Sequence, residues 1–148
     1  MTTKGELVVE KAKGWLGTPY HSQAKVKGAG VDCVWLLIAA FEEAGILKQG
    51  EYNPGYYSPE WHLHRSEEKY LHGVHLFCDK VEPPYQPGDI ALFKFGRCVS
   101  HGAIVVKWPV IIHAYIGLGV IQSRINEAIL CKNNGESRLH GVYRWRDL

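Results

Sequence analysis

The sequence predicts an α+β fold, with helices in the first part of the chain and an antiparallel sheet in the second. Apolar residues recur at helical three- and four-residue spacings up to about residue 44, whereas short strand-like runs begin after Pro83, Pro84 and Pro87. Helices followed by strands is an order typical of α+β proteins. The chain has 148 residues, of which 46% are hydrophobic. This is enough for one domain, residues 1–148, with a buried core.

Two helices are predicted near the N-terminus. Residues 6–16 have an amphipathic pattern that ends at Gly17. The second helix is expected at residues 34–44, with Asp32 at the N-cap position and Gly45 after the last turn. Its first two turns are apolar on every side, so we expect this helix at the centre of the domain, packed against the sheet.

The strands are predicted in the second part of the chain. They follow a Tyr- and Gly-rich loop at residues 48–59 and a third, more polar helix within residues 60–73. Five segments have strand-like patterns, namely residues 89–95, 101–107, 110–115, 120–125 and 141–145. Short turns between them favour antiparallel neighbours, so we expect a meander packed against the second helix.

Charge and hydropathy exclude several classes of protein. The 17 basic and 15 acidic residues are spread along the chain, so no nucleic-acid partner is expected. The longest apolar run, residues 34–41, is far shorter than the roughly 20 residues that span a bilayer, so no membrane insertion is expected. Residues 1–14 lack the apolar core of a signal peptide, which predicts synthesis in the cytoplasm without an export signal. The four cysteines are far apart, as expected for free thiols.

Cys33 is the candidate nucleophile because it follows Asp32 in the first turn of the apolar helix. The partial positive charge of a helix N-terminus stabilises a thiolate, so the thiol pKa is expected to lie below its ordinary value of about 8.5. The backbone N–H of Cys33 would donate to an oxyanion at the same helix end. The alternative is a small buried hydrophobic residue without a chemical role.

His101 and His113 are polar residues in otherwise apolar, strand-like segments. One would take the thiol proton and the other would hold the first in the required tautomer. If the two strands pair through the turn at Trp108-Pro109, the numbers of paired residues sum to about 217. That register sets His101 opposite about Ile116, offset from His113 by about three residues. Capped core histidines are the alternative.

Several segments resemble, in order, the NlpC-type family of papain-like bacterial cysteine peptidases. The resemblance covers about residues 14–119 and rests on Gly14-Trp15-Leu16-Gly17-Thr18-Pro19-Tyr20, Val31-Asp32-Cys33, Gln86-Pro87-Gly88-Asp89-Ile90-Ala91-Leu92-Phe93, Ser100-His101-Gly102-Ala103-Ile104-Val105-Val106 and Ile111-Ile112-His113-Ala114. Residues 31–34, 96–101 and 139–145 are further similar to short members of the family encoded in bacteriophage tail modules and prophages.

The resemblance implies a papain-like α+β fold and a cysteine endopeptidase that hydrolyses peptidoglycan stem peptides, at the bond between D-glutamate and the diamino acid, without a cofactor. Cys33 would be the nucleophile, His101 the general base and acid, and His113 the residue that orients His101. Tyr20 would lie beside the nucleophile, at the oxyanion or the substrate, and Asp32 would help to bind the free amine of the substrate. Delivery in a virion or release by lysis would bring such a protein to the cell wall, with phage tail proteins as further partners.

The chain departs from the family directly after the cysteine. Val34 and Trp35 stand where the family usually has a Ser-Gly pair, so the substrate preference is more open than the reaction. Two other functions remain open at this point. One is an amidase or acyltransferase with the same thiol chemistry, and the other is a non-catalytic module of a phage tail.

Two further groups of residues allow a structural and a functional interpretation. Histidines and a cysteine with the spacing of possible zinc ligands occur at His62, His64, His72, His75 and Cys78. They lack the paired cysteines of a zinc finger, so solvated histidines are favoured and no metal is expected. Aromatic residues of the Gly- and Pro-rich loop and just after it are expected to pin the loop to the body rather than to line a groove; they are Tyr52, Tyr56, Tyr57 and Trp61.

Overall fold

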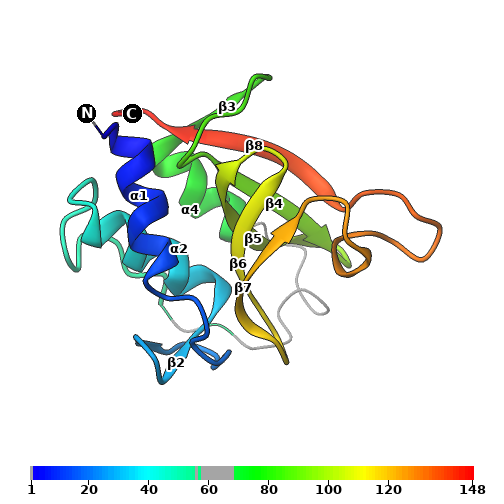
Figure 1. The fold of residues 1–148 in the computed structure, drawn as a ribbon, viewed down its shortest axis with the longest axis horizontal. Helices are drawn as coiled ribbons and strands as arrows, with labels where there is room; N and C mark the ends of the chain where they lie inside the picture. Colours follow the sequence, from blue (N-terminus) through cyan, green and yellow to red (C-terminus); the bar gives the residue numbers. More distant parts are fainter. Residues whose placement is uncertain (1, 56, 58–68) are drawn as a thin grey trace.

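The computed structural model, which describes residues 2–55, 57 and 69–148, confirms the predicted α+β class. Helices α1 (Lys4–Lys13) and α2 (Cys33–Glu43) pack against each other and against the sheet, and α4 (Lys69–Phe77) packs on the sheet near α2 (Figure 1). The two chain ends lie close together. No helix in the described residues is long and apolar enough to cross a membrane.

The helices begin and end where local hydrogen bonds dictate. A capping box formed by Thr3 and Glu6 starts α1 earlier than predicted. Asp32 caps α2, as predicted. The predicted end of the third helix at Gly73 is wrong, because α4 continues to Phe77. Gly73 leaves room for Tyr52 in the middle of the helix, because a Cβ at this position would lie 2.6 Å from the Tyr52 hydroxyl.

Among the described residues, six strands form the main antiparallel sheet in the order β3-β8-β4-β5-β6-β7. They are β3 (Cys78–Val81), β4 (Ile90–Phe95), β5 (Cys98–Lys107), β6 (Val110–Tyr115), β7 (Gly119–Arg124) and β8 (Leu139–Trp145). A two-stranded ribbon, β1 (Lys25–Val26) with β2 (Gly30–Val31), and a short 3₁₀ helix, η1 (Ala128–Leu130), complete the elements. The sequence patterns missed β1, β2, β3 and η1.

The predicted meander is present in β4 to β7, but β8 returns to the other side of β4. A partly buried ion pair accompanies this return. Arg144 on β8 donates from Nε and Nη2 to the two carboxylate oxygens of Asp89, over 2.8 and 2.9 Å. Asp89 is fully buried at the start of β4, so this bidentate pair fixes the end of β8 against β4.

A register shift interrupts the hairpin of β5 and β6. Next to the turn Lys107 pairs with Val110, in agreement with the predicted sum of 217. Beyond a shift that follows Val105, Ile104 pairs with Ile112, which gives a sum of 216. Side chains of a strand alternate between the two faces of the sheet. A change of register by one residue therefore decides whether a given side chain of β5 and a given side chain of β6 lie on the same face or on opposite faces.

This shift decides how the two histidines lie. In the observed register the position across from His113 is Ala103, which is two residues from His101 and therefore on the same face of the sheet. The predicted register would have set His113 across from Ile104 and on the opposite face from His101. The irregular hairpin thus places both imidazoles on one face.

Helix α2 is buried along most of its length, whereas its first turn is only partly buried. Residues 36–41 are buried, as predicted for the central helix, whereas Val34 and Trp35 are half-buried. Cys33 is 5% exposed. The N-terminal end of α2 therefore reaches the edge of the core, beside β5.

Candidate active site

The carboxylate of Asp32 is enclosed by four hydrogen-bond donors. Oδ1 accepts from the backbone N–H groups of Val34 and Trp35 over 3.1 and 2.9 Å, which caps α2. Oδ2 accepts from the N–H of Gln23 over 2.6 Å and from the hydroxyl of Tyr57. Since Asp32 is 1% exposed, these donors stabilise a buried negative charge beside the candidate nucleophile.

Three segments surround Cys33. Its Sγ lies 3.6 Å from the carbonyl oxygen of Ser100 on β5. The Tyr70 hydroxyl of α4 donates to the backbone carbonyl of Cys33 over 2.8 Å. The Tyr20 hydroxyl is in hydrogen-bond contact with the thiol. The Asp32 cap uses the N–H groups of Val34 and Trp35, so the N–H of Cys33 is left for another acceptor.

The thiol is held in its neutral form. Burial, followed by the negative charge of Asp32, raises the pKa of Cys33 to about 12. Hydrogen bonds from Tyr20, Tyr70 and the N–H of Gly102 lower the pKa to a smaller extent. The prediction of a lowered pKa for Cys33 is therefore wrong. Burial and the negative charge of Asp32 outweigh the effect of the helix N-terminus.

His101, His113 and Ser123 form a line of side chains across β5, β6 and β7, which we call the His–His–Ser line. His101 Nε2 lies 2.7 Å from His113 Nδ1, and His113 Nε2 lies 2.9 Å from Ser123 Oγ. The exposed fractions of the three residues are 6%, 0% and 3%. Burial lowers the pKa of His113 to about 4, and burial together with the neighbouring His113 lowers the pKa of His101. Both imidazoles are neutral near pH 7.

Aromatic rings enclose His101. Phe93 and Phe95 of β4 and Tyr115 of β6 lie with ring centroids 5.7 to 5.8 Å from its imidazole. These rings restrict rotation of the imidazole and exclude water from its flanks. With Nε2 engaged by His113, Nδ1 is the nitrogen of His101 that can exchange a proton with the thiol.

The thiol lies against the backbone of β5 on both sides of His101. Cys33 approaches Ser100 and Gly102, the residues on either side of His101. Within the described residues the thiol bonds to the Ser100 carbonyl and not to an imidazole nitrogen. Hydrogen bonds of catalytic groups are often long or misaligned before substrate binds.

Tyr20 is held near the thiol by the segment before it. The N–H of Gly17 donates to Val120 on β7, and the N–H of Val120 donates to Thr18. Gly119 allows this close approach, because it has a φ of +78° and a Cβ there would lie 2.6 Å from the Thr18 oxygen. Residues 17–18 are thus fixed to β7, and Tyr20 bridges to Val31 just before Asp32.

The structure brings the predicted residues Cys33, Asp32 and Tyr20 together and pairs His101 with His113. It adds three residues that were not predicted for the site: Tyr57, Tyr70 and Ser123. Tyr57 was expected to pin its loop, and its hydroxyl does so by bonding to Asp32. No sequence pattern indicated Tyr70. Ser123 could have been found only from the register, since it pairs with Ile111 on β6.

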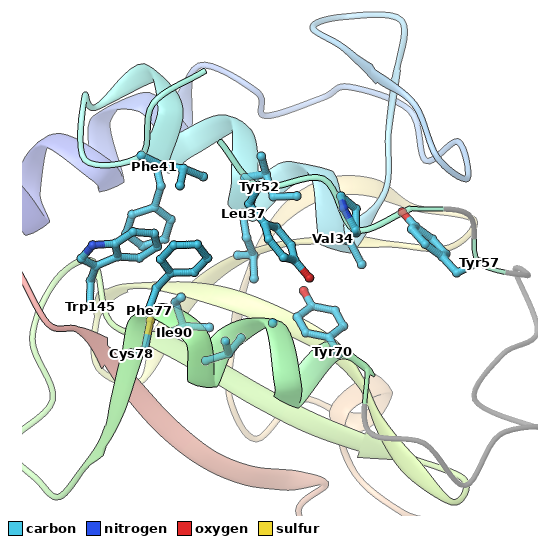
Figure 2. Close-up of a pocket in the computed structure, with 15 residues that line it drawn as sticks. Val34, Leu37, Phe41, Tyr52, Tyr57, Tyr70, Phe77, Cys78, Ile90 and Trp145 are labelled. Carbon is cyan, nitrogen blue, oxygen red and sulfur yellow. The ribbon is translucent and has the colours of Figure 1, made fainter. Parts of the chain in front are cut away.

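An apolar pocket of about 90 Å³ lies between α2 and α4, next to the site. Figure 2 shows Tyr52 and Tyr70 with their hydroxyls turned toward one another at its centre and Val34 and Tyr57 toward one end. At the other end the Trp145 ring stacks between Phe41 and Phe77. Val34 therefore gives the side of α2 next to the nucleophile an apolar surface. Trp35 instead packs under the ammonium group of Lys25.

The predictions for the possible zinc ligands and for the aromatic residues of the loop can be compared with the structure in part. His62, His64, Tyr56 and Trp61 lie outside the described residues. In the part of the chain that the structure describes, no group of three or more His, Cys, Asp or Glu side chains could hold a metal, and His72 and His75 are exposed. Tyr52 packs with its edge against Phe77, which is a pinning contact as predicted, but Tyr52 and Tyr57 also line the apolar pocket, which was not predicted.

The fold and this arrangement define a papain-like α+β protein, with a cysteine at the start of a buried helix and two paired histidines on adjacent strands. More particularly, the chain has the papain-like fold of NlpC/p60 domains, as solved structures show. No protein-family model and no curated protein sequence matches the chain. The fold is therefore recognised through structure, at low sequence identity.

Three solved structures illustrate the likeness. NlpC1 from Trichomonas vaginalis is 18% identical with a TM-score of 0.66, over 98% of this chain and 45% of NlpC1. The NlpC/p60 domain of the peptidoglycan hydrolase SagA is 19% identical with a TM-score of 0.56, over 82% of this chain and 89% of the domain. RipD from Mycobacterium tuberculosis, a non-catalytic NlpC/p60 domain protein adapted to peptidoglycan binding, is 16% identical with a TM-score of 0.61, over the full length of both.

The chain spans less than half of NlpC1 and most of the SagA domain. Since one neighbour is a hydrolase domain and another is non-catalytic, the fold alone does not decide the activity. The activity depends on the residues of the site.

Proposed function

We propose that the chain is a cysteine endopeptidase that hydrolyses peptidoglycan stem peptides at the bond between D-glutamate and the diamino acid. The observation that carries the proposal is the contact of 2.7 Å between His101 and His113, beside a thiol at the N-terminus of α2. A thiol and two imidazoles so arranged supply a nucleophile, a base and a group that orients the base. The likeness to the SagA domain supports peptidoglycan as the substrate class.

The reaction starts from a neutral thiol and a neutral imidazole. As Sγ of Cys33 bonds to the peptide carbonyl carbon, the thiol proton passes to Nδ1 of His101 and the carbonyl π electrons move to the oxygen. The N–H of Cys33 and the Tyr20 hydroxyl donate to that oxygen. The proton then passes from His101 to the leaving amine as the C–N bond breaks, which leaves a thioester. Water, deprotonated by His101, hydrolyses the thioester and restores the thiol.

Asp32 has two roles in this proposal. It caps α2, and it attracts the free amine of the substrate by its negative charge. Its oxygens already accept four hydrogen bonds, so an amine would share Oδ2 with the Tyr57 hydroxyl. Val34 sets an apolar surface beside the nucleophile, where the side chain of the substrate residue next to the scissile bond would lie.

Delivery is part of the same proposal. The sequence resemblance to phage tail-module members favours a protein made in the cytoplasm and brought to the cell wall in a virion or by lysis. Phage tail proteins would then be partners in addition to the peptidoglycan peptide.

A second candidate is peptidoglycan binding without hydrolysis. Two observations favour it: the likeness to RipD covers both chains completely, and the thiol pKa is raised rather than lowered. The candidates differ in whether the thiol is needed.

The decisive experiment is digestion of purified muropeptides, with products identified by mass spectrometry. Wild type should cut inside the stem peptide, Cys33→Ala should give no product, and Cys98→Ala should retain activity because Cys98 is a buried cysteine outside the site. Equal product from wild type and Cys33→Ala would exclude the nucleophile. Release of whole stem peptides would indicate an amidase, and binding to sacculi without any product would indicate the second candidate.

A further inference from the structure

The His–His–Ser line ends on a residue that the proposed reaction does not use. Ser123 pairs with Ile111, which places it two residues from the position across from His113 and on the same face of the sheet. Both ring nitrogens of His113 are therefore engaged, Nδ1 with His101 and Nε2 with Ser123. The line crosses three adjacent strands, β5, β6 and β7 (Figure 1).

The proton positions along this line depend on one another, because a neutral imidazole carries one N–H. To accept a proton at Nδ1, His101 must carry its own proton on Nε2 and donate it to Nδ1 of His113. His113 must then carry its proton on Nε2 and donate to Oγ of Ser123. In the reverse arrangement Ser123 donates to Nε2 of His113, and Nδ1–H of His113 donates to Nε2 of His101. His101 then carries its proton on Nδ1, so this nitrogen cannot accept a proton from the thiol.

We propose that Ser123 is a positioning residue that selects the reactive tautomers by accepting the Nε2–H of His113. Its effect on catalysis rests on the proposed function, whereas the tautomers are a property of the resting protein. A buried N–H without an acceptor is disfavoured. Removing the hydroxyl therefore removes the preference for the arrangement in which Nδ1 of His101 is free to accept a proton.

The charged and titratable groups around His113 do not replace this contact. His101 faces Nδ1 from β5. Tyr115 on β6 contacts the ring, with centroids 5.9 Å apart. Glu127, just before η1, raises the pKa of His113 by its charge, against the larger lowering by burial. Among the described residues, Ser123 is the one that is hydrogen-bonded to Nε2.

The first test measures tautomers without activity. In the Cys33→Ala background, imidazole ¹⁵N shifts of His101 and His113 should show protons on Nε2 in both residues. Ser123→Ala should give mixed tautomers in both, Ser123→Thr should restore the single form, and Gln122→Ala, an exposed neighbour on β7, should change nothing. Unchanged tautomers in folded Ser123→Ala would overturn the proposal.

The second test measures kinetics on muropeptides with otherwise wild-type protein. Ser123→Ala should lower kcat about tenfold, which corresponds to about 1.4 kcal/mol, with KM nearly unchanged. The acid limb of the profile of kcat/KM against pH should move to lower pH, because the imidazolium loses an acceptor. A purely structural role would leave that limb in place.

The two tests separate two kinds of failure. If digestion does not depend on Cys33, the proposed function fails, and the ¹⁵N shifts still decide the role of Ser123. If digestion depends on Cys33 but Ser123→Ala has wild-type kcat and an unshifted acid limb, the role of Ser123 in positioning is excluded.

Discussion

The site has two regions that are built in different ways. At the helix end, formed by Asp32, Cys33, Tyr57 and Tyr70, two polar contacts come from segments far apart in the chain: the Tyr57 hydroxyl donates to the buried carboxylate of Asp32, and the Tyr70 hydroxyl donates to the carbonyl of Cys33. In the His–His–Ser line, contacts come from adjacent strands and join neutral groups. The first region depends on charge and the second on register.

Burial acts on both regions with opposite effects on pKa. At the helix end it raises the pKa of the Cys33 thiol, and in the line it lowers the pKa of both imidazoles. In each case the neutral form is favoured, because burial penalises charge. The resting site therefore contains no thiolate–imidazolium pair, and proton transfer belongs to the reaction itself.

The largest expected effect concerns alkylation of Cys33. A pKa of about 12, against the ordinary value of about 8.5, reduces the thiolate fraction at pH 8 on the order of 10³-fold. Iodoacetamide should therefore label Cys33 far more slowly than it labels free cysteine, and the rate should still rise at pH 10. Asp32→Asn should move the profile to lower pH, because it removes a negative charge. Preferential labelling of Cys33 at pH 6 would contradict a neutral resting thiol.

The next largest effect is the loss of folding stability at acidic pH that the buried His113 causes. Below pH 6.5 the unfolded chain protonates His113 while the folded chain, with a pKa of about 4, does not. Stability should therefore fall between pH 6.5 and pH 4 and level off below, by about 3 kcal/mol from this residue. Urea unfolding at pH 7 and pH 4.5 measures the loss.

The matched variants for this measurement are His113→Asn, which should lose less stability on acidification, and His72→Gln, an exposed histidine on α4 that should behave as wild type. Equal losses in His113→Asn and wild type would show that another group controls the acid sensitivity.

The smallest expected effect concerns the Tyr57 hydroxyl. Tyr57→Phe removes one donor to the buried carboxylate of Asp32 and should reduce the free energy of unfolding by about 1.5–3 kcal/mol. Tyr85→Phe, at a half-buried tyrosine that packs on Trp108 away from the site, should cost much less. If both substitutions have the same cost in urea unfolding, the hydroxyl does not stabilise the helix end.

Much of the fold could be predicted because it depends on local patterns. The meander of β4 to β7 and the N-cap at Asp32 follow from alternation and from capping preferences. The return of β8 beside β4 could not be predicted, since it is accompanied by the long-range pair of Asp89 and Arg144. The short edge strand β3 has too few residues to show a pattern.

The site residues likewise fall into those that the sequence indicates and those that it does not. Cys33, His101 and His113 could be singled out because a polar or reactive residue in an apolar segment is visible in the sequence. Tyr70 and Ser123 could not, because their roles depend on tertiary contacts and on a register shift that no composition rule specifies. The thiol pKa was predicted in the wrong direction because burial cannot be measured in a sequence.

The register shift of the β5–β6 hairpin has a consequence for how such chains can vary in length. Inserting one residue into β5 or β6 between the turn and a histidine, with the pairing next to the turn retained, would exchange the face of one imidazole, whereas inserting two would keep both on one face. Relatives with a working pair should therefore differ within these strand segments by even numbers of residues, or should gain or lose a bulge together with an odd one, whereas the turn itself can vary in length. Counting residues from each histidine to the turn is then a parity test that can be applied to any candidate sequence.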